Sequence, residues 1–188
     1  MLFSFITVLL FSCSREKNGI LKKEQILSVY SNRYINENEY IFYKTQEDIS
    51  WFKNFINGTI TKQRIKEITK PVKGINFDSL LTTVDYQLWN KSLNKYNSIT
   101  WNQEKLSSIP FIDENEIPDY YYGKGIPAPS DSIITIYKLS TPIISNNVAL
   151  LYYSIKTSPL NSSKGYLMFA KINGKWQIVA KDVIVAVG

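Results

Sequence analysis

The residues best suited to bind a ligand or to carry out acid–base chemistry are concentrated in residues 102–130. Within this stretch a run of carboxylates that includes Glu116 precedes three consecutive tyrosines, Tyr120, Tyr121 and Tyr122. Carboxylates beside aromatic rings can bind a cation or stack against a sugar; the alternative is a loop whose rings pack over a sheet. Because long loops in compact domains are often functional, these four residues are candidate ligand-binding residues.

Asp85 is a further candidate, and it lies in the first turn of a helix predicted within residues 76–96. Apolar residues recur there at helical spacing, and Thr83 is positioned to cap the helix. With the carboxylates of residues 102–130, Asp85 could serve as the acid or base of a hydrolase. An acidic residue in a first turn more often stabilises the helix dipole, so we assign no catalytic residue.

The composition excludes several kinds of active site. The chain contains no His and a single Cys. Without His it lacks the commonest general base and metal ligand, and every Ser-His or Cys-His nucleophile arrangement. One Cys cannot form an internal disulfide or a Cys-based zinc site. Neither an EF-hand spacing nor a phosphate-binding glycine loop is present. We therefore expect no metal and no cofactor, and a binding domain rather than an enzyme.

The first residues are typical of an exported protein that is attached to a lipid. Residues 1–12 are apolar and uncharged, and they are too few to span a bilayer, which takes about 20 residues in a helix. The sequence Leu10-Phe11-Ser12-Cys13 that ends this segment resembles the lipobox of bacterial lipoproteins, in which the cysteine sulfur receives a diacylglyceryl group. No Lys or Arg precedes Arg15, so the basic start of a typical signal peptide is missing.

This leader sets the expected division of the chain. Residues 1–12 are predicted to be a lipoprotein signal peptide, and Cys13 is predicted to be the site of lipid attachment, with palmitate among its acyl chains. Polar residues in 13–19 would form a tether. Residues 20–188 are long enough for one domain with a sizeable core, and Pro71 and Gly74 mark the place, near 71–74, where two lobes would divide.

The last third of the chain is predicted to form the sheet that positions these candidates. Four segments there are rich in β-branched and aromatic residues and are separated by turn residues: 132–139, 147–156, 165–172 and 175–187. Asn173 and Gly174 predict a two-residue type I′ turn between the last two segments.

Pairing outward from this turn predicts a register and two faces. One face, expected to be the core side, would hold the pairs Lys171–Trp176, Phe169–Ile178 and Leu167–Ala180. The other face, with Lys175, Gln177 and Lys181 among Met168, Ala170 and Val179, is mixed and is expected to be half covered.

Several short motifs in the same region follow a recurring order. They are Ser140-Thr141-Pro142-Ile143-Ile144-Ser145, Val148-Ala149-Leu150-Leu151-Tyr152-Tyr153, Gly165-Tyr166-Leu167 and Asn173-Gly174-Lys175-Trp176. Together with the helix that carries Asp85, this order resembles that of small lipoproteins and secreted proteins of Bacteroidota, over roughly residues 78–178. That family has no established activity, so the resemblance implies an envelope location and no particular chemistry.

The sequence therefore predicts an α+β fold, in which an antiparallel sheet of four or more strands, mainly C-terminal, packs on N-terminal helices. An NTF2-like cone, whose curved sheet wraps helices around a pocket, is the variant considered first. The function predicted is that of an envelope-anchored lipoprotein with a non-enzymatic binding or interaction domain. The alternative is a carboxylate-dependent hydrolase or other enzyme with its site near residues 102–130.

Charge limits the expected partners. The net charge is +6, and residues 59–73 are the most basic stretch, which could face anionic headgroups or an anionic glycan, although a solvated helix or edge strand explains it as well. The predicted partners are the membrane, through the lipid on Cys13, and an envelope protein or anionic glycan, with no nucleic acid. The predicted location is the outer membrane, facing the periplasm or the cell surface.

Overall fold

The structure, a computed structural model, describes residues 22–31, 33, 40–43, 58–94, 101, 110–124, 135–158, 160–182 and 185–187. The predicted signal peptide, Cys13 and the tether lie outside these residues. Among the described helices, none combines the length and the apolar character needed to cross a membrane.

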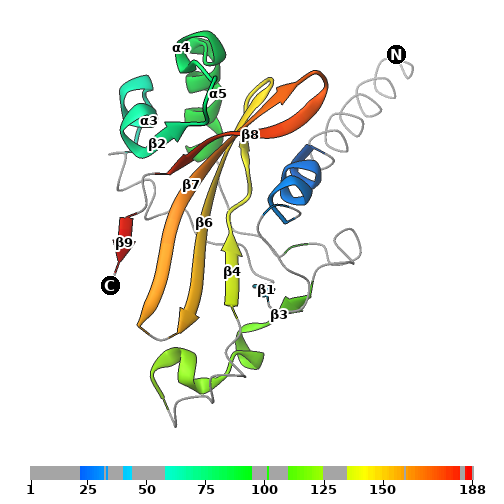
Figure 1. Cartoon of the computed structure of the whole chain (residues 1–188), viewed down its shortest axis with the longest axis vertical. Helices are drawn as coiled ribbons and strands as arrows, with labels where there is room; N and C mark the ends of the chain where they lie inside the picture. The colour runs from blue at the N-terminus through cyan, green and yellow to red at the C-terminus, as the bar shows by residue number, and fades with distance from the viewer. Residues whose placement is uncertain are drawn as a thin grey trace, which may run out of the picture.

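One sheet forms the centre of the molecule (Figure 1). The strands among the described residues are β1 (Tyr40–Tyr43), β2 (Thr69–Pro71), β3 (Phe111–Ile112), β4 (Thr135–Leu139), β5 (Ile143–Ile144), β6 (Val148–Ser158), β7 (Asn161–Ile172), β8 (Lys175–Asp182) and β9 (Val185–Val187). Their order is β2-β8-β7-β6-β4-β1-β3, with β5 paired to β6 and β9 paired to β7. β1 runs parallel to β3 and β4, and the other pairs are antiparallel.

The helices come mainly from the first half of the chain. They comprise a helix over residues 22–31, α3 (Lys62–Ile68), α4 (Phe77–Leu80) and α5 (Thr83–Asn94), and two short 3₁₀ helices, η2 (Glu114–Glu116) and η3 (Asp119–Tyr122). Thr61 caps α3 by accepting a hydrogen bond from the Arg64 backbone N–H. α3 leads directly into the edge strand β2, so residues 59–73 contain both structures proposed for them. The α+β prediction is confirmed.

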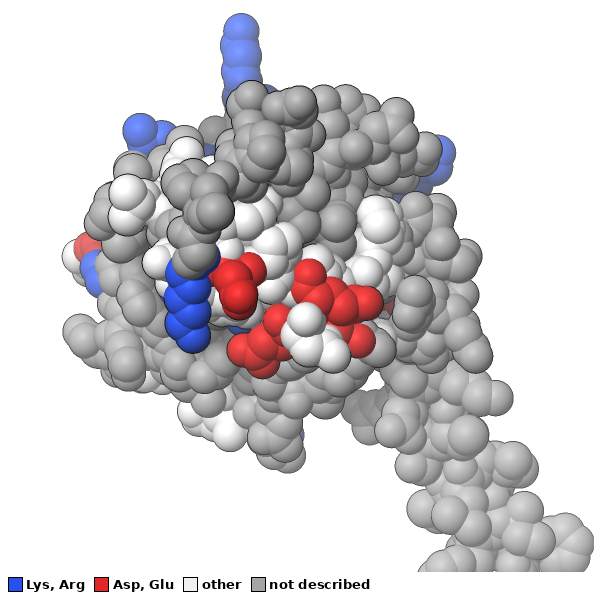
Figure 2. All heavy atoms as spheres, turned by 90° about the horizontal axis from the view of Figure 1, so that it is seen from below, with Lys and Arg blue, Asp and Glu red and all other residues white. Residues whose placement is uncertain are grey.

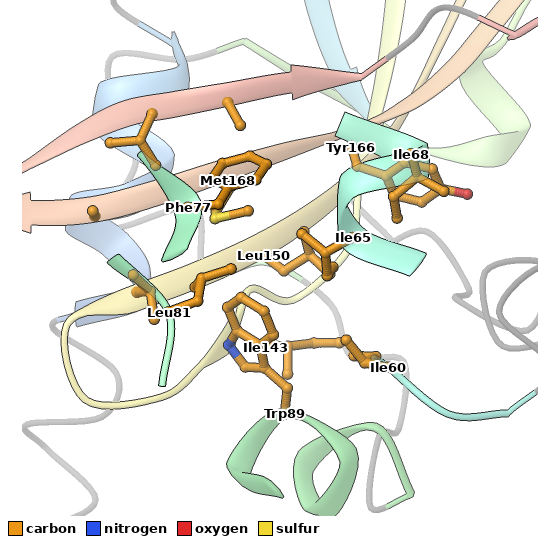
Figure 3. Packing of buried hydrophobic residues seen from close by; sticks show 14 of the residues in the cluster. Ile60, Ile65, Ile68, Phe77, Leu81, Trp89, Ile143, Leu150, Tyr166 and Met168 are labelled. Atoms are coloured by element: carbon orange, nitrogen blue, oxygen red, sulfur yellow. The ribbon is translucent and has the colours of Figure 1, made fainter. Parts of the chain in front are cut away.

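Helices cover both faces of the upper part of the sheet. On one face α3, α4 and α5 contribute Ile65, Phe77 and Trp89 to a core with Leu150 and Met168 (Figure 3). Alternation along a strand sends successive side chains to opposite faces. The intervening residues of β6 and β7 therefore pack on the opposite face, against the helix over residues 22–31.

This arrangement corrects one expectation about the sheet. Met168, Ala170 and Val179, which were expected to lie on a half-covered face, are at most 1% exposed because α3, α4 and α5 cover them. Helices on both faces differ from the NTF2-like variant, in which a curved sheet wraps them around a pocket. Residues on both sides of 71–74, such as Ile65 and Phe77, belong to the same hydrophobic core.

The hairpin between β7 and β8 confirms the predicted turn but only part of the predicted register. Asn173 and Gly174 have φ angles of 50° and 79°, as a type I′ turn requires. The pairs Lys171–Trp176 and Phe169–Ile178 form as predicted.

Beyond Ile178 the register shifts by one residue. Ala180 pairs with Met168, and Lys181 pairs with Leu167. The predicted pair Leu167–Ala180 is therefore wrong, because a β-bulge inserts an extra residue into β8. The sequence predicted one continuous strand over 175–187, but the structure has two. β8 ends at Asp182, and β9 pairs with residues 162–164 at the start of β7.

Candidate functional site

Asp85 is a buried structural residue that joins α5 to the sheet. Its carboxylate accepts hydrogen bonds from the backbone N–H of Thr82 at 2.8 Å and from the Thr82 hydroxyl at 2.7 Å. Its other oxygen accepts a 2.5 Å bond from the hydroxyl of Ser145, in the turn between β5 and β6. The cap of α5 is therefore Thr82, one residue before the predicted Thr83.

The electrostatics of Asp85 follow from these bonds. Burial raises the pKa of its carboxyl, but hydrogen bonds from Ser145 and Thr82 lower it by more, so the net pKa lies below its ordinary value. Three donors stabilise the ionised carboxylate of Asp85: the N–H and hydroxyl of Thr82 and the hydroxyl of Ser145. Such a group is poorly placed to exchange protons with a substrate near neutral pH.

Glu116 also has a structural partner. It is exposed in η2, where its carboxylate accepts a 2.7 Å hydrogen bond from the backbone N–H of Asp113. This bond closes the first turn of the 3₁₀ helix.

The three tyrosines have different environments. Tyr121 is 1% exposed and packs with Ile112 and Ile136, and its ring centroid lies 4.5 Å from that of Tyr120. Tyr122 is 47% exposed. Tyr120 and Tyr121 therefore pack η3 on the sheet, as the loop alternative predicted, whereas Tyr122 does not.

Acidic side chains gather on one face of the molecule (Figure 2), and two acids, Glu114 and Asp119, act on Tyr122. Partial burial raises the pKa of the Tyr122 phenol, and repulsion from Glu114 and Asp119 raises it further. The Lys156 ammonium lies 5.6 Å from the centre of the Tyr122 ring, within range of a cation–π contact. No group of three or more acidic, His or Cys side chains among the described residues is arranged to hold a metal ion.

The basic stretch 59–73 is partly neutralised by its own neighbours. Lys62 and Lys66 contact the Asp78 carboxylate at 2.5 and 2.9 Å, and Arg64 contacts Glu67 at 2.6 Å. These exposed pairs lower the field that α3 presents to an anionic glycan or headgroup.

Among the described residues, a cleft of about 530 Å³ on another part of the surface is a further candidate for a binding site. It lies where the helix over residues 22–31 approaches the edge of β8. The described side chains that line it are apolar or cationic, with one amide: Val29, Arg33, Val72, Gln177, Ile178 and Lys181. The volume is in the range of small-molecule sites in proteins.

Asp85, Glu116 and the three tyrosines are all absent from this lining. The structure does not bring them together in the cleft; Asp85 bonds to the β5–β6 turn, and the others belong to the η2–η3 segment. No protein-family model, curated protein or solved structure matches this chain.

Sequence reasoning missed the cleft. Its lining comes from segments near residues 30, 72 and 178, and nothing in their spacing indicates that they meet. The one local signal was the helical spacing of Val29 and Arg33, which lie four residues apart and thus on one face of a helix.

Proposed function

We propose that this chain is an envelope-anchored lipoprotein whose folded domain binds a ligand or partner and does not catalyse a reaction. The cleft lined by Arg33 and Lys181 carries the binding part of the proposal, because a concave site with apolar walls and a few polar groups is the usual form of a ligand site. The hydrogen bonds of Asp85 and the packing of Tyr121 support a structural role for the residues an enzyme would need.

The anchoring part of the proposal is supported by the leader. An apolar, uncharged segment ends at Leu10-Phe11-Ser12-Cys13, and acylation at Cys13 would hold the domain at the outer membrane. Each buried CH₂ contributes about 0.8 kcal/mol, so two or more acyl chains anchor a protein stably where a single chain does not.

Radiolabelled palmitate tests the anchor directly. The full chain, expressed in a bacterium that processes lipoproteins, should incorporate the label and sediment with membranes. Cys13→Ala should incorporate none and should leave the membrane fraction, because the acceptor sulfur is gone. Ser14→Ala is the matched control and should label like the wild type. An unlabelled wild-type chain that retains Met1 would contradict the proposal.

A further inference from the structure

The β-bulge in β8 determines which side chains enter the cleft. In a regular strand Lys181 would lie on the face opposite Trp176 and Ile178, because the side-chain period is two. The register shift between Met168 and Phe169 reverses this order, so that Lys181 pairs with Leu167. Leu167 packs in the core on the side of the helix over residues 22–31. The bulge thus turns Lys181 toward the side that carries the cleft, a known use of bulges near functional sites.

Positive charge is concentrated at this end of the sheet. Arg33 and Lys181 both line the cleft, and Lys70 of β2 stands directly opposite Lys181 in the antiparallel register. None of the described residues lining the cleft is acidic.

The same cleft also has apolar walls and an open strand edge. Val29 and Ile178 are half-buried, and Val72 is 39% exposed. β2 pairs with β8 only at residues 180–182, and the last contact is the Val72 N–H to the Val179 carbonyl at 2.9 Å. A ligand here would meet apolar surface on one side and the Gln177 amide at the strand edge.

We infer that the cleft binds a small organic anion that carries one carboxylate or phosphate group on an apolar body. The guanidinium of Arg33 can hold two oxygens of such a group at once, and Lys181 supplies a second charge. Val29, Val72 and Ile178 would remove the apolar body from water. This inference rests on the proposed binding role, and it commits that role to one ligand class.

Calorimetric titration of the full chain in non-ionic detergent tests the inference, with a titration into detergent alone subtracted. Hydrocinnamate combines a carboxylate with a ring and should bind saturably. Hydrocinnamyl alcohol, which lacks the charge, and propionate, which lacks the ring, should each bind at least about tenfold more weakly. Phenylphosphate distinguishes a preference for phosphate from one for carboxylate. Binding should weaken as salt is added, because the charges are exposed.

Variants locate the site. Arg33→Gln and Lys181→Gln should each weaken hydrocinnamate binding by about tenfold, since each removes a charge-assisted hydrogen bond. Lys171→Gln, on the same hairpin but outside the cleft, is the control and should bind like the wild type. Absence of saturable binding, equal binding of acid and alcohol, or equal binding by the Arg33 and Lys171 variants would overturn the inference. Palmitate labelling does not depend on ligand binding. The lipid-anchor proposal and the anion-binding inference can therefore fail independently.

Discussion

A carboxylate withdrawn from water is stable in a protein only when hydrogen bonds replace its hydration. Asp85 is 4% exposed and accepts bonds from Thr82 and Ser145. The bond to Ser145 joins residues that are 60 positions apart. Asp85 therefore acts both as a helix-capping residue and as the attachment of α5 to the sheet.

Replacing this carboxylate should destabilise the fold. We expect Asp85→Asn to lower the free energy of unfolding by about 1–3 kcal/mol at neutral pH, because buried donors lose a charged acceptor. Urea unfolding followed by circular dichroism measures the change. Asp119→Asn, an exposed first-turn acid in η3, is the matched control and should change stability by less than about 0.5 kcal/mol.

The same substitution predicts a pH dependence. The pKa of Asp85 is lower in the folded chain than its ordinary value of 3.8, so its stabilising effect is complete above that value and is lost as the pH falls through the folded-state pKa. The difference in stability between wild type and Asp85→Asn should therefore be constant near neutral pH and should shrink below about pH 4. A difference that grows in acid would mean that Asp85 is held in its protonated form.

At the scale of elements, α5 packs on the sheet through two fully buried side chains, Trp89 and Leu93. Trp89 is fully buried in the core that contains Ile143 and Leu150 (Figure 3). Its ring meets that of Tyr86 edge-on, with the centroids 5.9 Å apart. On the same helix Val84 is 50% exposed. Alanine substitutions at Trp89 and Val84 therefore distinguish the loss of buried packing from a change in helix propensity.

Trp89→Ala should lower the free energy of unfolding by about 3–5 kcal/mol, since it removes buried apolar surface and leaves a cavity. Val84→Ala should change it by less than about 0.5 kcal/mol. Thermal and urea unfolding of both variants measures the difference. Equal effects at the two positions would mean that α5 does not pack on the sheet as described.

Single elements were the part of the fold that the sequence predicted best. Asn173-Gly174 identified its turn because few residues tolerate positive φ at both positions. The cap of α5 was placed one residue late, although Thr82 is followed three residues later by an acid, Asp85, as in a capping box, whereas Thr83 is followed at that spacing by Tyr86. That error was avoidable from the sequence.

At the scale of the whole molecule, the features that position the cleft could not be predicted. Apolar residues continue through Ile178, Val179 and Ala180, so the side-chain pattern contains no sign of the extra residue. The bulge depends on how β7 and β2 pair with β8 on its two sides. One unforeseen residue moved Lys181 to the opposite face of the sheet, where this exposed side chain lines the cleft.

The central proposal for the whole molecule is that the cleft binds an organic anion. A crystal structure of the full chain with bound hydrocinnamate tests this proposal most directly, because it shows where the ligand lies. We predict density for the carboxylate between Arg33 and Lys181, with the ring against Val29, Val72 and Ile178. Hydrocinnamate bound at another place, such as the surface near Tyr122, with the cleft empty, would contradict the claim.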